Sequence, residues 1–311
     1  MAVVSRTNAT SRQITRSWSS SRRREPDAYL GYLFFAPALL LVLVLKGYPL
    51  ARGAYLSLTR PVGVRHNEYA GLANYRMLIE DDVFRAAMTN ALKGFVVLPL
   101  FVAIPLLTAY PIFLRVRGWR FFRATYFFSY TLPPVMVGYI FSFILGIDGP
   151  LNTFLRRIGF DRLAIQWFGT LNTALWSVFA VVLWSWFGLG TVVYLAGLAT
   201  IDEDYLDAAK VDGAGWLQTL RHIVVPSITP TIGYWSVVCT TGLLIWLFPF
   251  IFVLTEGGPG YASMTPEYYI YLVSTRYVDP GYASAMGLAL FVLVFFASIF
   301  QVRIMYLQSK E

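Results

Sequence analysis

The chain has few charged residues, one cysteine and two histidines. Charged residues occupy 14% of its 311 positions and hydrophobic residues 57%, whereas about a quarter of the residues in an average soluble protein are charged. This balance excludes an ordinary soluble domain and indicates an integral membrane protein. The single cysteine, Cys239, also excludes a disulfide within the chain.

The shortage of catalytic side chains argues against an enzyme. His66 and His222 fall in links that we expect on opposite sides of the membrane, so they cannot share a metal ion or a catalytic triad. The sequence contains no Gly-x-x-x-x-Gly-Lys-Ser/Thr motif, the loop that holds nucleotide phosphates in many ATPases. We therefore expect a non-catalytic membrane subunit with no cofactor and no metal of its own.

Six apolar runs are long enough to cross a bilayer as helices, which takes roughly 20 residues for a core of about 30 Å. Prolines inside the runs, Pro133 and Pro249 among them, predict kinks. The sequence thus predicts an all-α, polytopic membrane protein with about six transmembrane helices. The expected spans are Tyr29 to Leu56, Ala86 to Leu114, Ala124 to Ile147, Asn172 to Thr200, Pro230 to Leu254 and Ser284 to Gln301.

Arginine placement predicts the orientation. Residues 1–28 hold six arginines and are too polar to pack, which predicts a disordered basic cytoplasmic tail before a membrane domain at 29–311. Four more arginines lie between the second and third runs, and positive residues favour the cytoplasmic side. Both termini and the 201–229 link are then cytoplasmic, while segments 57–85, 148–171 and 255–283 face outside. The same rule accounts for the net charge of +8 without a nucleic-acid partner.

The 201–229 link is too regularly patterned for a plain connector. Its apolar and small residues recur at three- and four-residue steps, as on one face of a helix, and Gly213 is placed to end one short helix before another. A helix lying on the membrane would carry a basic polar face, and this one is acidic. We favour a protein-docking element over a surface helix or a solvated loop. The stripe is formed by Leu206, Ala209, Gly213, Trp216, Leu217 and Leu220.

This link resembles the coupling loop of bacterial ABC importer permeases. That loop reads Glu-Ala-Ala, then a glycine, then Ile-x-Leu-Pro, and this sequence has the same spacing in Asp207-Ala208-Ala209, Gly213 and Ile223-x-x-Pro226. Two residues depart from the pattern, Asp207 in place of Glu and Val225 in place of Leu. Further matches resemble the carbohydrate uptake transporter type 1 branch, namely Tyr48-Pro49, Gly71-Leu-Ala-Asn-Tyr75, Val253-Leu-Thr-Glu-Gly-Gly-Pro259 and Tyr282-Ala-Ser-Ala285.

The resemblance implies a type I ABC importer permease fold with a cytoplasmic coupling helix, in the bacterial plasma membrane. It implies four partners: a second homologous permease subunit, two cytoplasmic subunits that bind ATP and Mg, and an extracytoplasmic solute-binding protein. The solute would be sugar-like, such as a disaccharide, an oligosaccharide or a glycerol phosphate compound. The residues implied for ATPase coupling are Leu206, Asp207, Ala208, Ala209, Asp212, Gly213, Trp216, Ile223 and Pro226.

A substrate path is harder to place. For the alternating rings near Pro249 we favour packing against lipid or neighbouring helices, with stacking on the apolar face of a sugar as the alternative. Asn90 suits contacts between helices better than a hydrogen bond to a solute, and Tyr130 is a second candidate for such a hydrogen bond. The residues of this path are Asn90, Tyr130, Trp246, Phe248, Phe250 and Phe252.

A transporter driven by an ion gradient is the alternative to an ATP-driven importer. Such a protein would need acidic side chains within its spans to carry protons or sodium ions. The six apolar runs contain no Asp or Glu, so the sequence favours coupling through the 201–229 link.

Overall fold

The protein is described by a computed structural model that covers residues 27–62 and 66–308. Nearly all of the predicted basic tail, and Lys310 at the other terminus, lie outside the described residues. The described chain is helical apart from one two-stranded hairpin, which confirms the predicted all-α class. It divides into two compact units between Leu50 and Ala51, and the second unit carries the sites discussed below.

The first apolar run forms one helical path with a local irregularity. Helix α1 (Asp27–Val42) passes through a π-helical turn, η1 (Leu43–Gly47), into α2 (Tyr48–Leu56). In a regular helix the ring of Pro49 would clash with the carbonyl four residues earlier, and the wider turn directly before it relieves that clash. Residues Tyr32–Leu56 are long and apolar enough to span a membrane.

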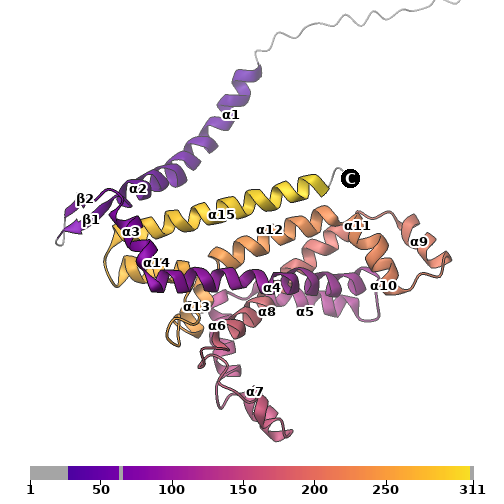
Figure 1. Cartoon of the computed structure of the whole chain (residues 1–311). Helices are drawn as coiled ribbons and strands as arrows, with labels where there is room; N and C mark the ends of the chain where they lie inside the picture. The colour runs from indigo at the N-terminus through magenta and orange to yellow at the C-terminus, as the bar shows by residue number, and fades with distance from the viewer. Residues whose placement is uncertain (1–26, 63–65, 309–311) are drawn as a thin grey trace, which may run out of the picture. The chain divides into compact units, whose positions relative to one another are not determined.

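Long helices that run alongside one another form the frame of the second unit (Figure 1). They are α4 (Asp82–Phe113), α8 (Ala174–Leu198), α12 (Thr229–Ile245) and α15 (Pro280–Gln308), with α4 packed against α8 and α12. Close approach depends on glycine, because a Cβ at Gly188 would lie 2.0 Å from the carbonyl oxygen of Tyr126 on α5 (Trp119–Thr131). These contacts place the hydrophobic core between α4, α8 and α12.

The third predicted span is not one helix. Helix α5 ends at Thr131, α6 (Pro134–Ile144) begins after Pro133, and their axes differ by 102°. Leu132 is extended, as steric contact with a following proline requires. The prediction of a kink is confirmed, and the kink is sharp enough to divide the predicted span 124–147 into two helices.

The fifth predicted span, Pro230 to Leu254, is also interrupted. Helix α12 ends at Ile245, and α13 (Phe248–Leu254) starts after two residues, with Pro249 in a first turn where its missing N–H is not needed. The carboxylate of Glu267, at the start of α14 (Pro266–Thr275), accepts the backbone N–H of Leu247 at 3.0 Å. The 255–283 segment thus helps to hold this break. Pro249 predicted a kink here, but the sequence did not predict the contact with Glu267.

Four described helices are long and apolar enough to span a membrane, and six spans result if each of two bent pairs counts as one. One pair is α5 with α6. The other joins residues Trp216–Ser227 to α12 at an angle of 79° and comprises α10 (Trp216–Thr219), the π-helical η3 (Leu220–Val224) and α11 (Val225–Ser227). The larger number agrees with the predicted count of about six.

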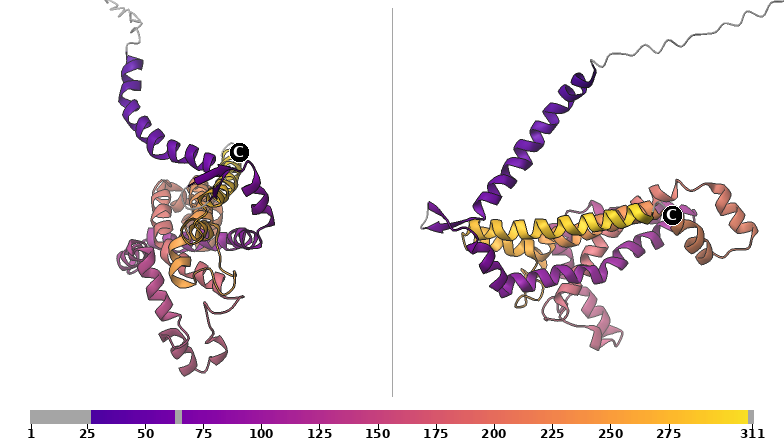
Figure 2. Two further views of the ribbon diagram at one scale, coloured as in Figure 1. Left: turned by 90° about the vertical axis from the view of Figure 1, so that its left-hand side faces the viewer. Right: turned by 45° about the horizontal axis from the view of Figure 1, so that its top comes forward.

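Short elements cluster at the end of the bundle where α4 and α15 begin. Strands β1 (Thr59–Val62) and β2 (His66–Tyr69) pair antiparallel, and α3 (Ala73–Glu80) follows them. Buried Asn74 donates from its amide to the carbonyls of Ser57 and Thr59, both at 2.8 Å. The Gly-Leu-Ala-Asn-Tyr motif therefore anchors the hairpin to α3. The last turns of α15 lie at the opposite end, beside the start of α12, as Figure 1 and the right-hand view of Figure 2 show.

Candidate coupling element and substrate cavity

The 201–229 link folds as two short helices joined at a glycine, as predicted. The side chain of Asp202 accepts the N–H of Asp204 and caps α9 (Glu203–Val211). Gly213 has a φ of +72° and donates to the carbonyl of Lys210, while Ala214 donates to that of Ala209 at 2.9 Å. This pair of hydrogen bonds is the usual helix end at a left-handed glycine. After it, α10, η3 and α11 lead into α12.

Three of the six residues of the apolar stripe face their own chain, whereas Gly213, Trp216 and Leu217 are exposed. Leu206 is 8% exposed, Ala209 4% and Leu220 5%, so they pack in the core rather than present a surface. Both side chains are therefore covered by their own chain here, and their predicted contact with a partner stays a prediction. Asp207, Ala208, Asp212, Gly213 and Pro226 are exposed, and Ile223 is half-buried.

The exposed face of the link combines apolar and charged side chains. Val211 is 88% exposed and Leu217 65%, a costly arrangement for apolar residues in an unpartnered soluble loop. Beside them Asp207 accepts a hydrogen bond of 2.8 Å from Lys210, an ion pair one helical turn apart. Val211 was not predicted as a surface residue, and its exposure is visible only once the helix face is known.

Trp216 connects the link to a membrane span. Its ring lies 5.5 Å from that of Tyr110, which is buried near the end of α4. Trp216 itself remains 45% exposed, so one part of the indole packs on α4 while the rest is accessible. A movement of α10 would therefore reach α4 directly.

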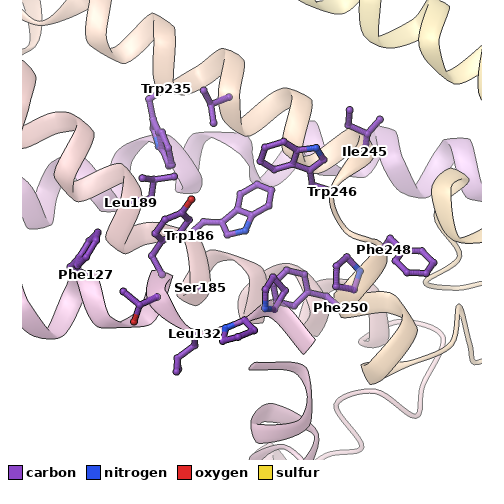
Figure 3. A pocket seen from close by; sticks show the side chains of 16 residues that line it. Phe127, Leu132, Ser185, Trp186, Leu189, Trp235, Ile245, Trp246, Phe248 and Phe250 are labelled. Carbon is purple, nitrogen blue, oxygen red and sulfur yellow. The ribbon is translucent and has the colours of Figure 1, made fainter. Parts of the chain in front are cut away.

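A cavity of about 770 Å³ lies where the two broken helices approach α8 (Figure 3). The α5–α6 break contributes Leu132 and Pro133, and the α12–α13 break contributes Trp246 and Pro249. Trp186 of α8 and Trp235 of α12 complete much of its wall. Four of the six predicted path residues line it: Tyr130, Trp246, Phe248 and Phe250.

The cavity is aromatic and uncharged. No Asp, Glu, Lys or Arg occurs among the described residues that line it, and its polar groups come chiefly from the hydroxyls of Tyr130 and Ser185 and from indole nitrogens. Trp235 is not a free donor, because its indole N–H donates to the carbonyl of Phe101 at 2.9 Å. Such a site suits a neutral solute with apolar faces and hydroxyl groups.

Two predicted path residues lie elsewhere. Asn90 donates to the carbonyls of Tyr261 and Met264 and accepts a 2.9 Å hydrogen bond from Lys93, so its amide is fully engaged between α4 and the 255–265 segment. Phe252 is outside the cavity and stacks on Phe248 at 5.7 Å. These contacts favour the packing interpretation of Asn90, and a solute contact through this residue stays a prediction.

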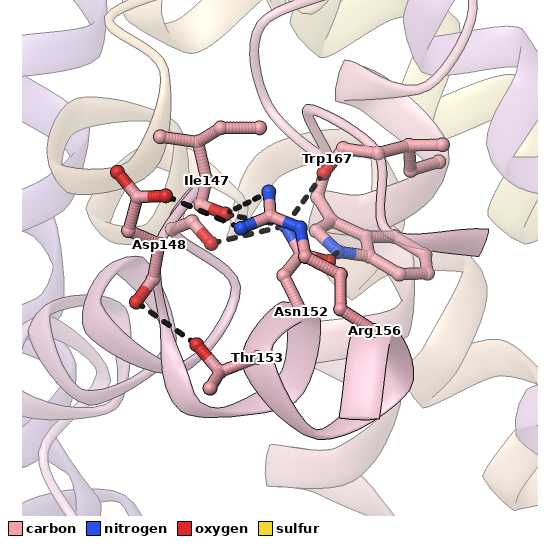
Figure 4. Close-up of polar contacts among 8 residues, drawn as sticks. Ile147, Asp148, Asn152, Thr153, Arg156 and Trp167 are labelled. Carbon is pink, nitrogen blue, oxygen red and sulfur yellow. Dashed lines mark hydrogen bonds and ion pairs between the residues drawn. The ribbon is translucent and has the colours of Figure 1, made fainter. Parts of the chain in front are cut away.

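The segment between α6 and α8 is held by an asparagine that sequence reasoning missed (Figure 4). The amide of Asn152, on α7 (Pro150–Arg157), donates to the carbonyls of Gly146, Ile147 and Ile165, and its oxygen accepts the indole N–H of Trp167 at 3.0 Å. Arg156 pairs with Asp148 at 3.3 Å. The sequence shows only an asparagine in a polar stretch, and the burial of Asn152 is known only from the structure.

The fold and the cavity together define a class of protein. A polytopic helical membrane protein with two broken helices around a solute-sized cavity, and an exposed helix–glycine–helix element at one end, is a transport subunit. Residues 101–305 match the family model described as the binding-protein-dependent transport system inner membrane component. The chain belongs to this family.

Known relatives cover almost its whole length. The chain is 31% identical to the probable ABC transporter permease protein YurN of Bacillus subtilis, over 90% of this chain and 97% of that protein. It is 29% identical to the multiple sugar-binding transport system permease protein MsmF of Streptococcus mutans, over 91% and 97%. A subunit of a bacterial ABC transporter involved in the import of alginate has the same fold, with a TM-score of 0.77 over 89% of this chain and 95% of that one, at 22% identity.

Family membership confirms several predictions from the sequence. The chain is a multi-pass permease subunit of an ABC importer of the carbohydrate uptake branch, and it is a non-catalytic membrane component. A transporter driven by an ion gradient, the alternative, is not favoured.

Proposed function

We propose that this chain forms half of the translocation path of an ATP-driven importer and contacts a neutral disaccharide or oligosaccharide in the cavity between α5, α8, α12 and α13. The main support for this proposal is the wall of the cavity, which has aromatic rings and hydroxyls but no charged side chain among the described lining residues. Aromatic faces pack on the C–H faces of sugar rings, whereas a buried anion needs cationic partners. A glycerol phosphate compound is therefore the less favoured solute.

The printed names of relatives support the sugar class. MsmF is named for a multiple sugar-binding transport system, and the structure with the same fold belongs to a transporter of the polysaccharide alginate. Alginate is acidic, and at 22% identity that neighbour informs the fold alone. The uncharged cavity is thus the argument for a neutral solute.

Energy would enter through α9 and α10. In this proposal two cytoplasmic subunits bind ATP and Mg, and one of them receives the exposed face of Asp207, Ala208, Val211, Asp212 and Gly213 in a groove. Closure of the ATPase dimer then moves α10, and the Trp216–Tyr110 contact transmits that motion to α4. These contacts can shift the equilibrium between two conformations of the importer only if their free energy differs between those conformations.

The other partners follow from the same orientation. The termini and the 201–229 link are cytoplasmic in a bacterial plasma membrane, and a second homologous permease completes the cavity. An extracytoplasmic solute-binding protein delivers the sugar to the end where α4 and α15 begin. The rigid segment around Asn152 and α7 is one surface that this protein would meet.

The test is to co-purify this chain with the products of neighbouring genes and to measure ATPase activity in nanodiscs with a loaded binding protein and a panel of sugars. We expect stimulation by one neutral sugar and loss of that stimulation in Asp207→Ala. Asp207→Glu is the matched control, because it keeps a carboxylate at this position, where the coupling-loop pattern has Glu, and should retain the stimulation. A complex without an associated ATPase would refute the proposal, and stimulation only by a phosphorylated solute would refute the neutral class.

A further inference from the structure

A second cavity of about 820 Å³ lies between the coupling element and the ends of two membrane spans. Its apolar wall comes from the last turns of α4 and α8, including Phe113, Leu195 and Ala196. The candidate spans themselves end at Phe113 and Leu198. The cavity therefore lies at the level where the hydrocarbon core of a bilayer gives way to headgroups.

One side of the cavity is strongly basic. Residues 112–123 contain four arginines and no Asp or Glu, and two of these, Arg115 and Arg123, line the cavity. The opposite side, on α9, contributes Glu203, Asp207 and Lys210, and Asp207 is already paired with Lys210 at 2.8 Å. An anion in this cavity would therefore sit on the arginine side.

Arg115 occupies a backbone position where glycine is the usual residue. Its φ is +54°, its N–H donates to Ile112, and the N–H of Val116 donates to Pro111, which is the same helix end that Gly213 forms after α9. Left-handed backbone is unfavourable for a residue with a Cβ. The local backbone alone would favour glycine, so an arginine here points to a role for its side chain.

We propose that this cavity binds an anionic phospholipid, with its phosphate between Arg115 and Arg123 and the upper part of its acyl chains against the apolar wall. Basic pockets between helices on the cytoplasmic side are suited to acidic headgroups. Trp119 also lines the cavity, with the guanidinium of Arg120 5.4 Å above its ring, and an indole at this level is typical of the membrane interface. The inference rests on the cytoplasmic orientation in the proposed function.

A bound lipid would contact the coupling helix. Leu206 and Lys210 of α9 line the same cavity as the ends of α4 and α8. A lipid that fills it joins α9 to both spans and restrains their relative motion. The ATPase coupling of the importer should therefore depend on anionic lipid.

Native mass spectrometry of the assembled importer tests the binding step without any transport. The complex is exchanged into detergent with phosphatidylglycerol or phosphatidylcholine, and retained lipid is counted. We expect the wild type to retain phosphatidylglycerol in preference to phosphatidylcholine. Arg115→Gln or Arg123→Gln should retain about fivefold less phosphatidylglycerol, because one basic residue near an anionic surface contributes roughly 1 kcal/mol. Arg117→Gln, from the same link but outside the cavity lining, should retain it normally.

Arg115→Gly separates lipid binding from folding. Glycine relieves the left-handed backbone, so this variant should match or exceed the wild type in thermal stability and still lose phosphatidylglycerol. Equal retention by the wild type, Arg115→Gly and Arg123→Gln would overturn the proposal, as would an equal loss in Arg117→Gln. Displacement of the lipid by glycerol 3-phosphate at equal concentration would show a site for a soluble phosphate and also overturn it.

The ATPase measurement distinguishes this inference from the proposed function. Nanodiscs with 25 mol% phosphatidylglycerol should support more binding-protein-stimulated hydrolysis than phosphatidylcholine alone, and the difference should shrink in Arg115→Gly. Stimulation that is equal in both lipids would overturn the lipid site and leave the importer intact. Absence of stimulation in every lipid, with normal lipid retention, would instead refute the importer.

Discussion

The phenol of Tyr282 donates a hydrogen bond of 2.6 Å to the carboxylate of Asp81, although 201 positions separate the two residues. Tyr269 donates to the same oxygen at 2.8 Å, and the other oxygen accepts the N–H groups of Val83 and Phe84. One carboxylate thus caps α4 and joins it to α14 and α15. This clasp holds the end of the bundle where we expect the solute to enter.

Removal of one donor should weaken the clasp. Tyr282→Phe keeps the ring and loses a hydrogen bond to a charged group, a contact that contributes about 1.5–3 kcal/mol. We expect a free energy of unfolding lower by about 1.5 kcal/mol, seen as a lower thermal midpoint in tryptophan fluorescence. Tyr277→Phe, at a ring that is 65% exposed, is the control and should not change the midpoint. An unchanged midpoint in Tyr282→Phe would contradict the clasp.

Acid should remove the contribution of the Asp81 carboxylate to the stability of the folded protein. Burial alone would raise the pKa of Asp81, but hydrogen bonds from Tyr282, Tyr269 and the backbone of Phe84 and Val83 outweigh burial and lower it. Because the folded-state pKa is below the unfolded-state value, the carboxylate stabilises the protein fully above about pH 4 and progressively less as the pH falls through the lowered value. The difference in thermal midpoint between wild type and Asp81→Asn should be constant from pH 7 to 5 and shrink below 4. A difference that does not shrink at all as the pH falls from 5 to 3 would refute this.

Close packing at Gly188 should not tolerate a methyl group. The Cβ of an alanine there would lie 2.0 Å from a backbone oxygen of Tyr126, which cannot rotate away as a side chain does. We expect Gly188→Ala to lose at least about 3 kcal/mol of stability, at or above the usual cost of overpacking, and to elute as aggregate in size-exclusion chromatography. Gly287→Ala, in open space on α15, should be neutral or gain up to about 1 kcal/mol.

The sequence predicts the number and approximate place of the spans well, because the length of an apolar run reports directly on the bilayer. It predicts poorly what happens inside a run. Pro133 indicates a kink, but the 102° turn depends on how α6 packs against α13 and α8, which lie far along the chain. The Glu267–Leu247 contact across the second break is likewise a product of tertiary structure.

Candidate site residues show the same limit. The three- and four-residue spacing correctly predicts that Leu206 and Ala209 share a helix face, but not whether their own chain or a partner covers it. Asn90 is a polar residue in an apolar run, which indicates a buried hydrogen bond without naming its acceptors. The contacts of Asp81 with two phenols could not be predicted from the sequence, because both tyrosines come from its last quarter.

Gly213 should matter for coupling more than for folding. Its φ of +72° is strained for alanine by about 1–2 kcal/mol, while the space around it is open. We expect Gly213→Ala to reduce binding-protein-stimulated ATPase activity with a modest drop in thermal midpoint. Gly118→Ala carries the same backbone strain outside the 201–229 link, at a φ of +88° with only ordinary contacts around the added Cβ, and should lower the midpoint alone. Equal ATPase losses in both variants would show a general folding effect.

Trp246 is the sharpest test of the sugar cavity, because it lines the cavity and is yet 62% exposed. Phe250 is 1% exposed, so its replacement would damage the core and confuse the result. Aromatic stacking contributes about 0.5–1.5 kcal/mol, and Trp246→Ala should therefore reduce sugar uptake in proteoliposomes roughly twofold to tenfold with an unchanged thermal midpoint. Phe143→Ala, an exposed ring outside the cavity lining, should leave uptake unchanged. Normal uptake in Trp246→Ala would contradict a sugar contact in this cavity and place the solute contacts on the second permease.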